Sequence, residues 1–180
     1  MAANRLGNCA PFKPVSIAGR NYSFDHLKAL TLNVADGERL LRILINFSCH
    51  CFTEKFDGDM ASAYRHGGEL RRLSAERSAL SRHLPGMIQA IADKKVFFTR
   101  ETNYLTVELV DHDGASVRYT MFFDLKRAHD AAHDLVMTVE SAYIKVALPR
   151  HLDKIRFSIL ARKVARGEKV RSPYHFQKRK

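Results

Sequence analysis

The chain has 180 residues, of which 46% are hydrophobic and 27% are charged. This length and composition suit one globular domain, or one domain with an appendage, and they exclude a disulfide-stapled mini-protein, a collagen-like chain and wholesale disorder. Thirty Lys and Arg against nineteen Asp and Glu give a formal charge of +11, which favours a polyanionic partner, nucleic acid first and an anionic membrane second.

The cysteine count and the hydropathy pattern predict a cytoplasmic protein. Three cysteines are an odd and small set, unlike the even framework of a secreted disulfide protein. No run of eighteen apolar residues is present, and the first residues lack the apolar core of a signal peptide. We therefore expect no transmembrane segment, and the oligomeric state is left open.

Two β-rich runs, residues 22–34 and 38–53, are joined by Asp36-Gly37, which is a strong hairpin signal. The second run alternates between apolar and polar residues, as a strand with one buried face does. Its apolar face holds Leu41, Ile43, Ile45, Phe47, Cys49 and Cys51, and its polar face holds Arg42, Asn46, Ser48 and His50. The polar, glycine-rich residues 54–67 then predict a loop.

Apolar residues three or four apart, with one gap at Arg77, predict a long helix that begins near Leu70 and that Pro85-Gly86 kinks or splits. The stripe consists of Leu70, Leu73, Leu80, Leu84, Met87, Ile88 and Ile91. The period then returns to two and predicts strands over residues 96–109, 116–126 and 135–144.

A three-residue loop over 112–114 would join the first two of these strands, with Gly114 in the left-handed conformation. That register places Glu108 opposite Arg118, a favourable cross-strand pair. Keeping the apolar faces together in the next pairing would bring Thr120 near Glu140.

Together these elements predict an α+β fold: an antiparallel sheet of about five strands, able to curl toward a barrel, a long central helix and a basic C-terminal helix. The last helix is expected over residues 153–166, capped by Asp153 and ended by Gly167. The predicted organisation is an extended segment over residues 1–21, an α+β core over 22–148, and a basic helix and tail over 149–180.

Cys49-His50-Cys51 contains residue types that bind zinc. Neighbouring side chains of a strand point to opposite faces, so these three cannot converge on one ion unless the strand breaks there. His26 would add only one more ligand on the cysteine face, and His129 and His133, four residues apart, have no third ligand that the sequence identifies. We therefore predict buried cysteines, a solvated connection, no metal and no cofactor.

Two polar sheet faces carry candidate acid–base groups. The hairpin would place Asp25 diagonal to His50, and a carboxylate beside an imidazole is what general acid–base catalysis needs. The second face would group Glu108, Arg118 and Glu140, so that a carboxylate could deprotonate a ribose 2′-hydroxyl while the guanidinium stabilises the developing charge. An ordinary surface hydrogen bond and a solvated ladder of ion pairs are the favoured interpretations of the two faces.

The strongest functional signal is the basic end of the chain. From residue 150 onward eleven Lys or Arg accompany two acids, so that +9 of the total charge lies there. Cations interleaved with aromatic rings can neutralise phosphates and stack bases. The candidate nucleic-acid-binding residues are Arg156, Arg162, Lys163, Arg166, Lys169, Arg171, Tyr174, Phe176, Lys178, Arg179 and Lys180.

The leading hypothesis is a nucleic-acid-binding protein, with RNA favoured over DNA, and a module that binds an acidic protein partner is the alternative class. The order of a helix, several antiparallel strands and a basic C-terminal element over residues 69–148 resembles the small RelE-type and barnase-type ribonucleases. That resemblance, which is one of topology, implies a metal-independent endoribonuclease and assigns no catalytic residue.

Overall fold

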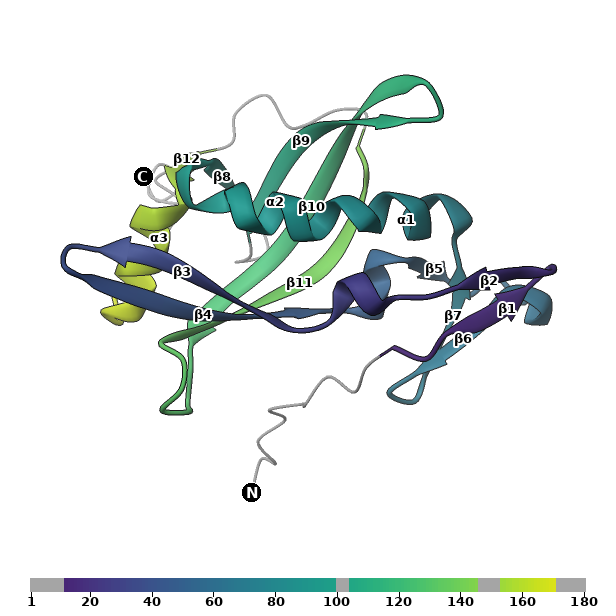
Figure 1. The fold of residues 1–180 in the computed structure, drawn as a ribbon, viewed down its shortest axis with the longest axis horizontal. Coiled ribbons are helices and arrows are strands. Elements are labelled where there is room, and N and C mark those ends of the chain that lie inside the picture. The colour runs from purple at the N-terminus through teal and green to yellow at the C-terminus, as the bar shows by residue number, and fades with distance from the viewer. Residues whose placement is uncertain (1–11, 100–103, 146–152, 171–180) are drawn as a thin grey trace, which may run out of the picture.

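The computed structural model describes residues 12–99, 104–145 and 153–170 (Figure 1). Its main element is a mixed sheet of seven strands. The strands are β3 (Leu30–Asp36), β4 (Arg39–Phe47), β8 (Lys95–Phe98), β9 (Tyr104–His112), β10 (Ala115–Arg127), β11 (Leu135–Ile144) and β12 (Lys154–Arg156). Their order across the sheet is β12-β8-β9-β10-β11-β4-β3, and all neighbours are antiparallel except β11 and β4.

Two small sheets lie beside the main one, at the right of Figure 1. One is the hairpin of β1 (Val15–Ile17) and β2 (Arg20–Tyr22), and the other has the order β5-β7-β6, with β5 at Thr53–Lys55, β6 at Ala63–His66 and β7 at Glu69–Leu73. The helices are α1 (Ala75–Leu80), α2 (Leu84–Ala90) and α3 (Phe157–Ala165). Short 3-10 turns cover Asp25–Leu27, Cys49–Cys51, Met60–Ser62, Ser81–His83 and Ile91–Asp93.

The main sheet curls into a half-barrel, and α1 and α2 cross in front of its central strands (Figure 1). Helix α3 packs against β3, β4, β10 and β11. The core between helices and sheet is apolar: Leu84, Ile88, Phe157 and Leu160 are fully buried. The alternation predicted for the second strand is confirmed over β4, where Leu41, Ile43, Ile45 and Phe47 are buried. Among the described residues, no helix is long and apolar enough to cross a membrane.

The α+β class is confirmed, but the prediction of an antiparallel sheet of about five strands is wrong. The sheet has seven strands, and β11 runs parallel to β4 with Leu135 opposite Ile43. Parallel neighbours need a long crossover, here all the chain between β4 and β11. Hairpin signals are local and predict only antiparallel neighbours, so the sequence pattern could not predict the parallel pairing of β11 with β4.

The predicted pairing of Glu108 with Arg118 is also wrong, by one residue. The loop between β9 and β10 has two residues, Asp113 and Gly114, both with positive φ (49° and 76°), as a type I′ turn requires. Glu108 therefore lies opposite Tyr119, and Arg118 lies opposite Leu109. A shift of one residue exchanges the two faces of a strand.

The central helical segment begins later than its apolar stripe predicts. Leu70 and Leu73 belong to β7, and α1 starts only after Ser74, whose hydroxyl accepts a hydrogen bond from the backbone N–H of Arg77 (3.4 Å). The expected interruption lies just before Pro85, where the 3-10 turn Ser81–His83 separates α1 from α2. A strand ending in Leu-x-x-Leu spacing is indistinguishable from a helix by period alone.

The C-terminal helix is shorter than predicted, because residues 154–156 form the edge strand β12 and α3 starts at Phe157 with Arg156, and not Asp153, as its N-cap. Gly167 ends it as expected. With φ of 73° it donates its N–H to the carbonyl of Val164 (2.9 Å), while the N–H of Glu168 bonds the carbonyl of Lys163 (3.0 Å). These two bonds satisfy the last carbonyls of the helix.

Candidate functional site

The strand that carries Ser48 to Cys51 breaks at the place where chemistry-bearing residues gather. Strand β4 ends at Phe47, and Cys49–Cys51 form a 3-10 turn that Ser48 caps: its hydroxyl accepts a hydrogen bond from the backbone N–H of His50 (3.2 Å). In a 3-10 helix successive side chains point about 120° apart instead of to opposite faces. The sequence argument against convergence of Cys49 and His50 therefore fails here.

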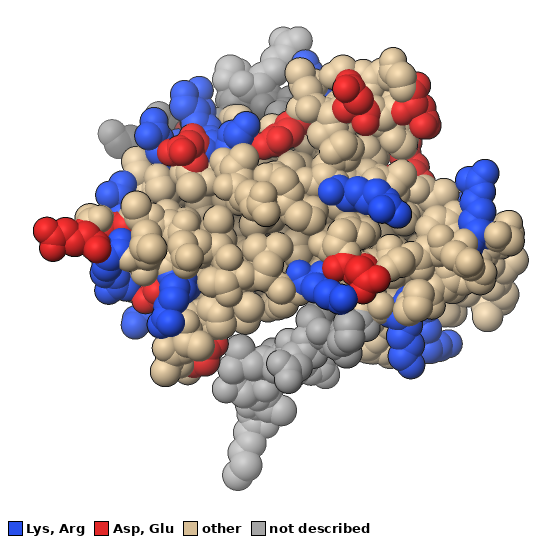
Figure 2. Space-filling model, in the orientation of Figure 1, with Lys and Arg blue, Asp and Glu red and all other residues tan. Residues whose placement is uncertain are grey.

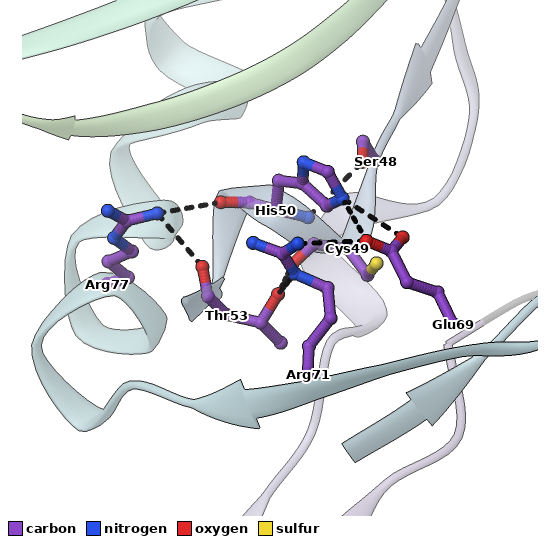
Figure 3. Close-up of polar contacts among 7 residues, drawn as sticks. All are labelled: Ser48, Cys49, His50, Thr53, Glu69, Arg71 and Arg77. Atoms are coloured by element: carbon purple, nitrogen blue, oxygen red, sulfur yellow. Dashed lines mark hydrogen bonds and ion pairs between the residues drawn. The ribbon is translucent and has the colours of Figure 1, made fainter. Parts of the chain in front are cut away.

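The His50 imidazole contacts the carboxylate of Glu69, at the start of β7, and the Cys49 thiol lies near them (Figure 3). The Nε2 atom of His50 lies 3.1 Å from Oε2 and 3.2 Å from Oε1 of Glu69. The Cys49 thiol completes a group whose potential metal-ligating atoms all lie within 4.8 Å of one another. We call Cys49, His50 and Glu69 the Cys49 cluster.

Polar contacts from the neighbouring strands hold this cluster in place. Arg71 donates from Nη1 to Oε1 of Glu69 (2.9 Å) and from Nε to the hydroxyl of Thr53 (2.8 Å). That hydroxyl donates in turn to the carbonyl of Cys49 (2.7 Å). Arg77 of α1 donates to the carbonyl of Thr53 (2.9 Å), which ties the helix to the same segment (Figure 3). The Cys49 turn thus meets β7 and the helix α1 that follows β7.

The electrostatics of the cluster set the charge of each group. The hydrogen bond from His50, followed by the guanidinium of Arg71, holds the pKa of Glu69 below its ordinary value, so this side chain is a carboxylate. Burial, followed by the charge of Glu69, raises the pKa of the Cys49 thiol. Cys49 is 4% exposed and is therefore a protonated thiol at neutral pH, not an activated nucleophile.

The predicted pair of His50 and Asp25 is not brought together. Strand β3 begins only at Leu30, and Asp25 lies in the preceding 3-10 turn, where its carboxylate contacts the Ser23 hydroxyl (2.7 Å) and the Lys28 ammonium (2.8 Å). These contacts lower the pKa of Asp25, that from Lys28 most. The carboxylate that meets His50 is Glu69, nineteen residues further along the chain.

The second predicted group is also divided. Glu108 and Arg118 lie on opposite faces of the β9–β10 ladder, and the carboxylate of Glu108 lies 3.4 Å from the ammonium of Lys94. Glu140 occupies the β-bulge of β11, where the register shifts between Phe122 and Phe123. The expected proximity of Thr120 and Glu140 is replaced by a pairing of Thr120 with Tyr143.

The other candidate metal ligands have structural contacts. His26 Nε2 lies 2.8 Å from the Ser81 hydroxyl, and Cys51 donates to the carbonyl of Val139 (3.7 Å). The connection that holds His129 and His133 is not helical. His133 contacts Asp130 through Nδ1 (3.2 Å).

Much of the predicted nucleic-acid surface is either engaged or outside the described residues. Arg162 donates to the carbonyl of Ser158 (3.2 Å). Lys163 pairs with Glu168 (2.9 Å) and Arg166 with Asp36 (3.2 Å). Lys169 is exposed. The remaining predicted positions, Arg171, Tyr174, Phe176, Lys178, Arg179 and Lys180, lie outside the described residues.

Arg156 belongs to a cationic surface that the sequence pattern did not predict. It stands directly opposite Lys95 across the β8–β12 pair, and Lys154 stands opposite Phe97. These four side chains share one face, because opposite residues and residues two apart point the same way. Their strand neighbour Val96 points to the core. We call Lys95, Phe97, Lys154 and Arg156 the β8–β12 face.

The three cations of this face are exposed, and no ion pair with them is found in the described part of the chain. Figure 2 shows Lys and Arg side chains gathered at the end of the molecule that carries β8, β12 and α3, with Asp and Glu among them. Like charges directly opposite one another destabilise a ladder unless a counter-charge is bound. The face is therefore suited to an anion.

A family model described as the YjaZ family matches residues 14–165. The chain belongs to the YjaZ family. The match includes both the Cys49 cluster and the β8–β12 face of this YjaZ protein. Neither the curated proteins nor the solved structures contain a match to the chain.

Sequence reasoning singled out Cys49, His50 and Arg156 but missed their partners. Glu69 lies in a segment that its neighbours Leu70 and Leu73 make resemble a helix, so no pairing with the Cys49 turn could be expected. Lys95 and Lys154 come from strands far apart in the sequence that pair only in the folded chain. The one available signal was the run Lys94-Lys95 directly before an apolar strand.

Proposed function

We propose that this YjaZ protein binds single-stranded RNA through the β8–β12 face. The observation that carries the proposal is the pairing of Lys95 with Arg156, two exposed cations directly opposite one another and next to Lys154 on the edge strand of the sheet. Phosphate groups would neutralise these charges, and the ring of Phe97 on the same face offers a surface for base stacking.

Two further features favour this assignment. Helix α3 begins directly after Arg156 without an acidic residue in its first turn, so the positive end of its dipole adds to the potential of the face. The sequence continues beyond α3 into Arg171, Lys178, Arg179 and Lys180, which bring more positive charge to the same end of the chain. Both features act on any polyanion, and the half-buried ring of Phe97 among exposed cations favours a single strand.

We do not propose ribonuclease activity for this protein. The residues that were predicted to supply its acid, base and cation are spread over different faces and segments: His50, Asp25, Glu108, Arg118 and Glu140. Binding to an acidic protein partner would use the same three cations, so it is tested as an outcome of the same experiment.

The test measures binding of the full chain to fluorescent single-stranded RNA, duplex RNA and single-stranded DNA at about 50 and about 200 mM salt. Several phosphate contacts predict a loss of affinity of about tenfold or more over this range. Combined substitution of Lys95, Lys154 and Arg156 by Ala should abolish most of the binding. It should also reduce the slope of the logarithm of the binding constant against the logarithm of the salt concentration by roughly two, because each phosphate contact to a single strand contributes about 0.7.

The matched control removes three exposed cations from the other end of the molecule, Lys13, Lys55 and Arg65, and so makes the same change in net charge. If both triple variants lose affinity equally, the attraction is a general effect of net charge and the proposed face is wrong. If both triple variants bind RNA as tightly as the parent does, an acidic protein becomes the better assignment for the partner of the β8–β12 face.

A further inference from the structure

We propose that the Cys49 cluster is a binding site for a zinc-type divalent cation, with Cys49, His50 and Glu69 as its three protein ligands. The geometric basis is the convergence of a thiol, an imidazole and a carboxylate within 4.8 Å. This site is distinct from the β8–β12 face, so it neither requires nor explains RNA binding.

The distances agree with one shared ion. Zinc binds nitrogen and oxygen ligands at about 2.0–2.2 Å and sulfur at about 2.3 Å, so two ligands of one tetrahedral ion lie roughly 3.2–3.7 Å apart. His50 Nε2 and Glu69 Oε2 are already 3.1 Å apart. The Cys49 sulfur has to move by about an ångström at most to complete the triangle, because no pair exceeds 4.8 Å.

The two oxygens of Glu69 have separate tasks in this arrangement. Oε1 accepts the hydrogen bond from Arg71 Nη1 (2.9 Å), which leaves Oε2 for the ion. A ligating carboxylate whose second oxygen is held by a hydrogen-bond donor is typical of metal centres. Arg71 itself is fixed by the Thr53 hydroxyl, and that hydroxyl also holds the carbonyl of Cys49, so one network orients two of the ligands.

Binding of the ion releases protons from its ligands and leaves the site without net charge. In the metal-free cluster the Nε2–H of His50 donates to Glu69. On binding, Nε2 gives up this proton and the ring carries its proton at Nδ1 instead, so that the lone pair of a neutral imidazole at Nε2 binds the ion. The Cys49 thiol transfers its proton to water and binds as a thiolate, and Glu69 binds as the carboxylate that it already is. The cation with two anionic ligands is then neutral, which relieves the cost of its half-buried position.

The identity of the ion follows from the ligands. Thiolate and imidazole select zinc, cobalt and their relatives, whereas magnesium and calcium prefer oxygen ligands only. Three protein ligands leave a fourth tetrahedral position for water or another molecule, as in zinc sites that are not closed. His50 and Glu69 are partly exposed, so this position lies on the solvent side of the cluster.

The experiment titrates the full chain carrying Cys9→Ser, which removes the cysteine outside the described residues, with Co²⁺ and Zn²⁺. One equivalent of Co²⁺ should give a thiolate-to-cobalt charge-transfer band, and Zn²⁺ should displace it, while Mg²⁺ should not. Glu69→Gln should weaken binding at least about tenfold. Cys49→Ala should abolish the band.

Cys51→Ala is the matched control, since Cys51 lies in the same turn but bonds Val139 instead of the cluster. It should keep both the band and the affinity. The proposal is overturned if the parent binds no Co²⁺, if Cys49→Ala binds it as well as the parent, or if Glu69→Gln leaves the affinity unchanged. RNA binding by the Cys49→Ala variant should equal that of the parent, which keeps the two proposals separable.

Discussion

Asp134 and Arg42 lock the start of the parallel pair β11–β4 through two hydrogen bonds. The Asp134 backbone N–H donates to the carbonyl of Arg42 (2.8 Å), and the Asp134 carboxylate accepts from the backbone N–H of Arg42 (2.8 Å). The same carboxylate pairs with Arg39 (2.8 Å). One side chain thus fixes the register of a pairing that brings together distant parts of the chain.

We expect Asp134→Ala to lower the free energy of unfolding by about 1–3 kcal/mol, because a charge-assisted hydrogen bond is lost and a backbone N–H loses its acceptor. Glu38→Ala, which removes an exposed carboxylate from the turn between β3 and β4, should change it by less than about 0.5 kcal/mol. Urea unfolding followed by circular dichroism measures both. Equal effects of the two substitutions would contradict the role of Asp134.

The same pair shows how far the sequence predicts this fold. Alternation over residues 39–47 identified β4 and its buried face, because the signal is local and repeated. It could not identify the neighbour, since any apolar strand can pack beside β4 and only the long crossover selects β11. The register of β9 and β10 failed for a related reason: one residue more or less in the turn exchanges the faces, and Asp-Gly suits either length.

The candidate sites were predictable only in part for physical reasons of the same kind. Cys49 and His50 stood out by residue type, but their convergence depends on a 3-10 turn of three residues, which is too short to leave a periodic signal. Arg156 stood out by local charge. Its partner Lys95 is brought beside it by an edge pairing of only three residues, which the sequence pattern does not encode.

The environment of His26 predicts that the free energy of unfolding falls in mild acid. Burial, followed by the charge of Arg82, lowers the pKa of His26 below its ordinary value of 6.5. The unfolded chain therefore binds a proton at this residue more readily than the folded chain, and folding stability falls as the pH drops below about 6.5. His26→Gln can keep a hydrogen bond to the Ser81 hydroxyl without titrating.

Thermal unfolding at about pH 7.5 and about pH 5.5 tests this prediction, and the difference in Tm between the two should be smaller for His26→Gln than for the parent. His129→Gln removes an exposed histidine from the connection between β10 and β11. This variant should show the same difference in Tm between the two pH values as the parent. An unchanged difference in the His26→Gln variant would mean that other groups account for the acid sensitivity.

Substitution by alanine at two glycines with equally open surroundings should change the stability of the protein in opposite directions. A Cβ at Gly114 or at Gly86 would meet no atom within 4 Å. Gly114 has φ of 76° in the β9–β10 turn, so Gly114→Ala should destabilise the protein by about 1 kcal/mol or more. Gly86 lies in α2 with helical geometry, so Gly86→Ala should stabilise it by roughly 0.5–1 kcal/mol. Chemical denaturation gives both values, and the same sign for both would contradict the turn assignment.

Phe97 and Lys154, opposite one another on the β8–β12 face, should contribute to RNA binding in distinguishable ways. Loss of a stacking ring costs about 1–3 kcal/mol per base, roughly 5- to 150-fold in affinity, without a change in the number of phosphates contacted. Phe97→Ala should therefore weaken binding to single-stranded RNA at every salt concentration and keep the salt slope. Lys154→Ala should reduce the slope by about 0.7 and lose its effect at high salt, because its contribution is the release of counterions.

Binding curves at four or more salt concentrations separate the two effects, and unfolding curves of both variants check that the half-buried Phe97 is not needed for the fold. Lys55→Ala, a single cation removed from β5, is the control for Lys154→Ala and should leave the slope of the parent. A Phe97→Ala variant that is stable and binds RNA as the parent does would remove stacking from the interaction. Binding would then rest on phosphate contacts alone, and duplex RNA should compete as well as single strands do.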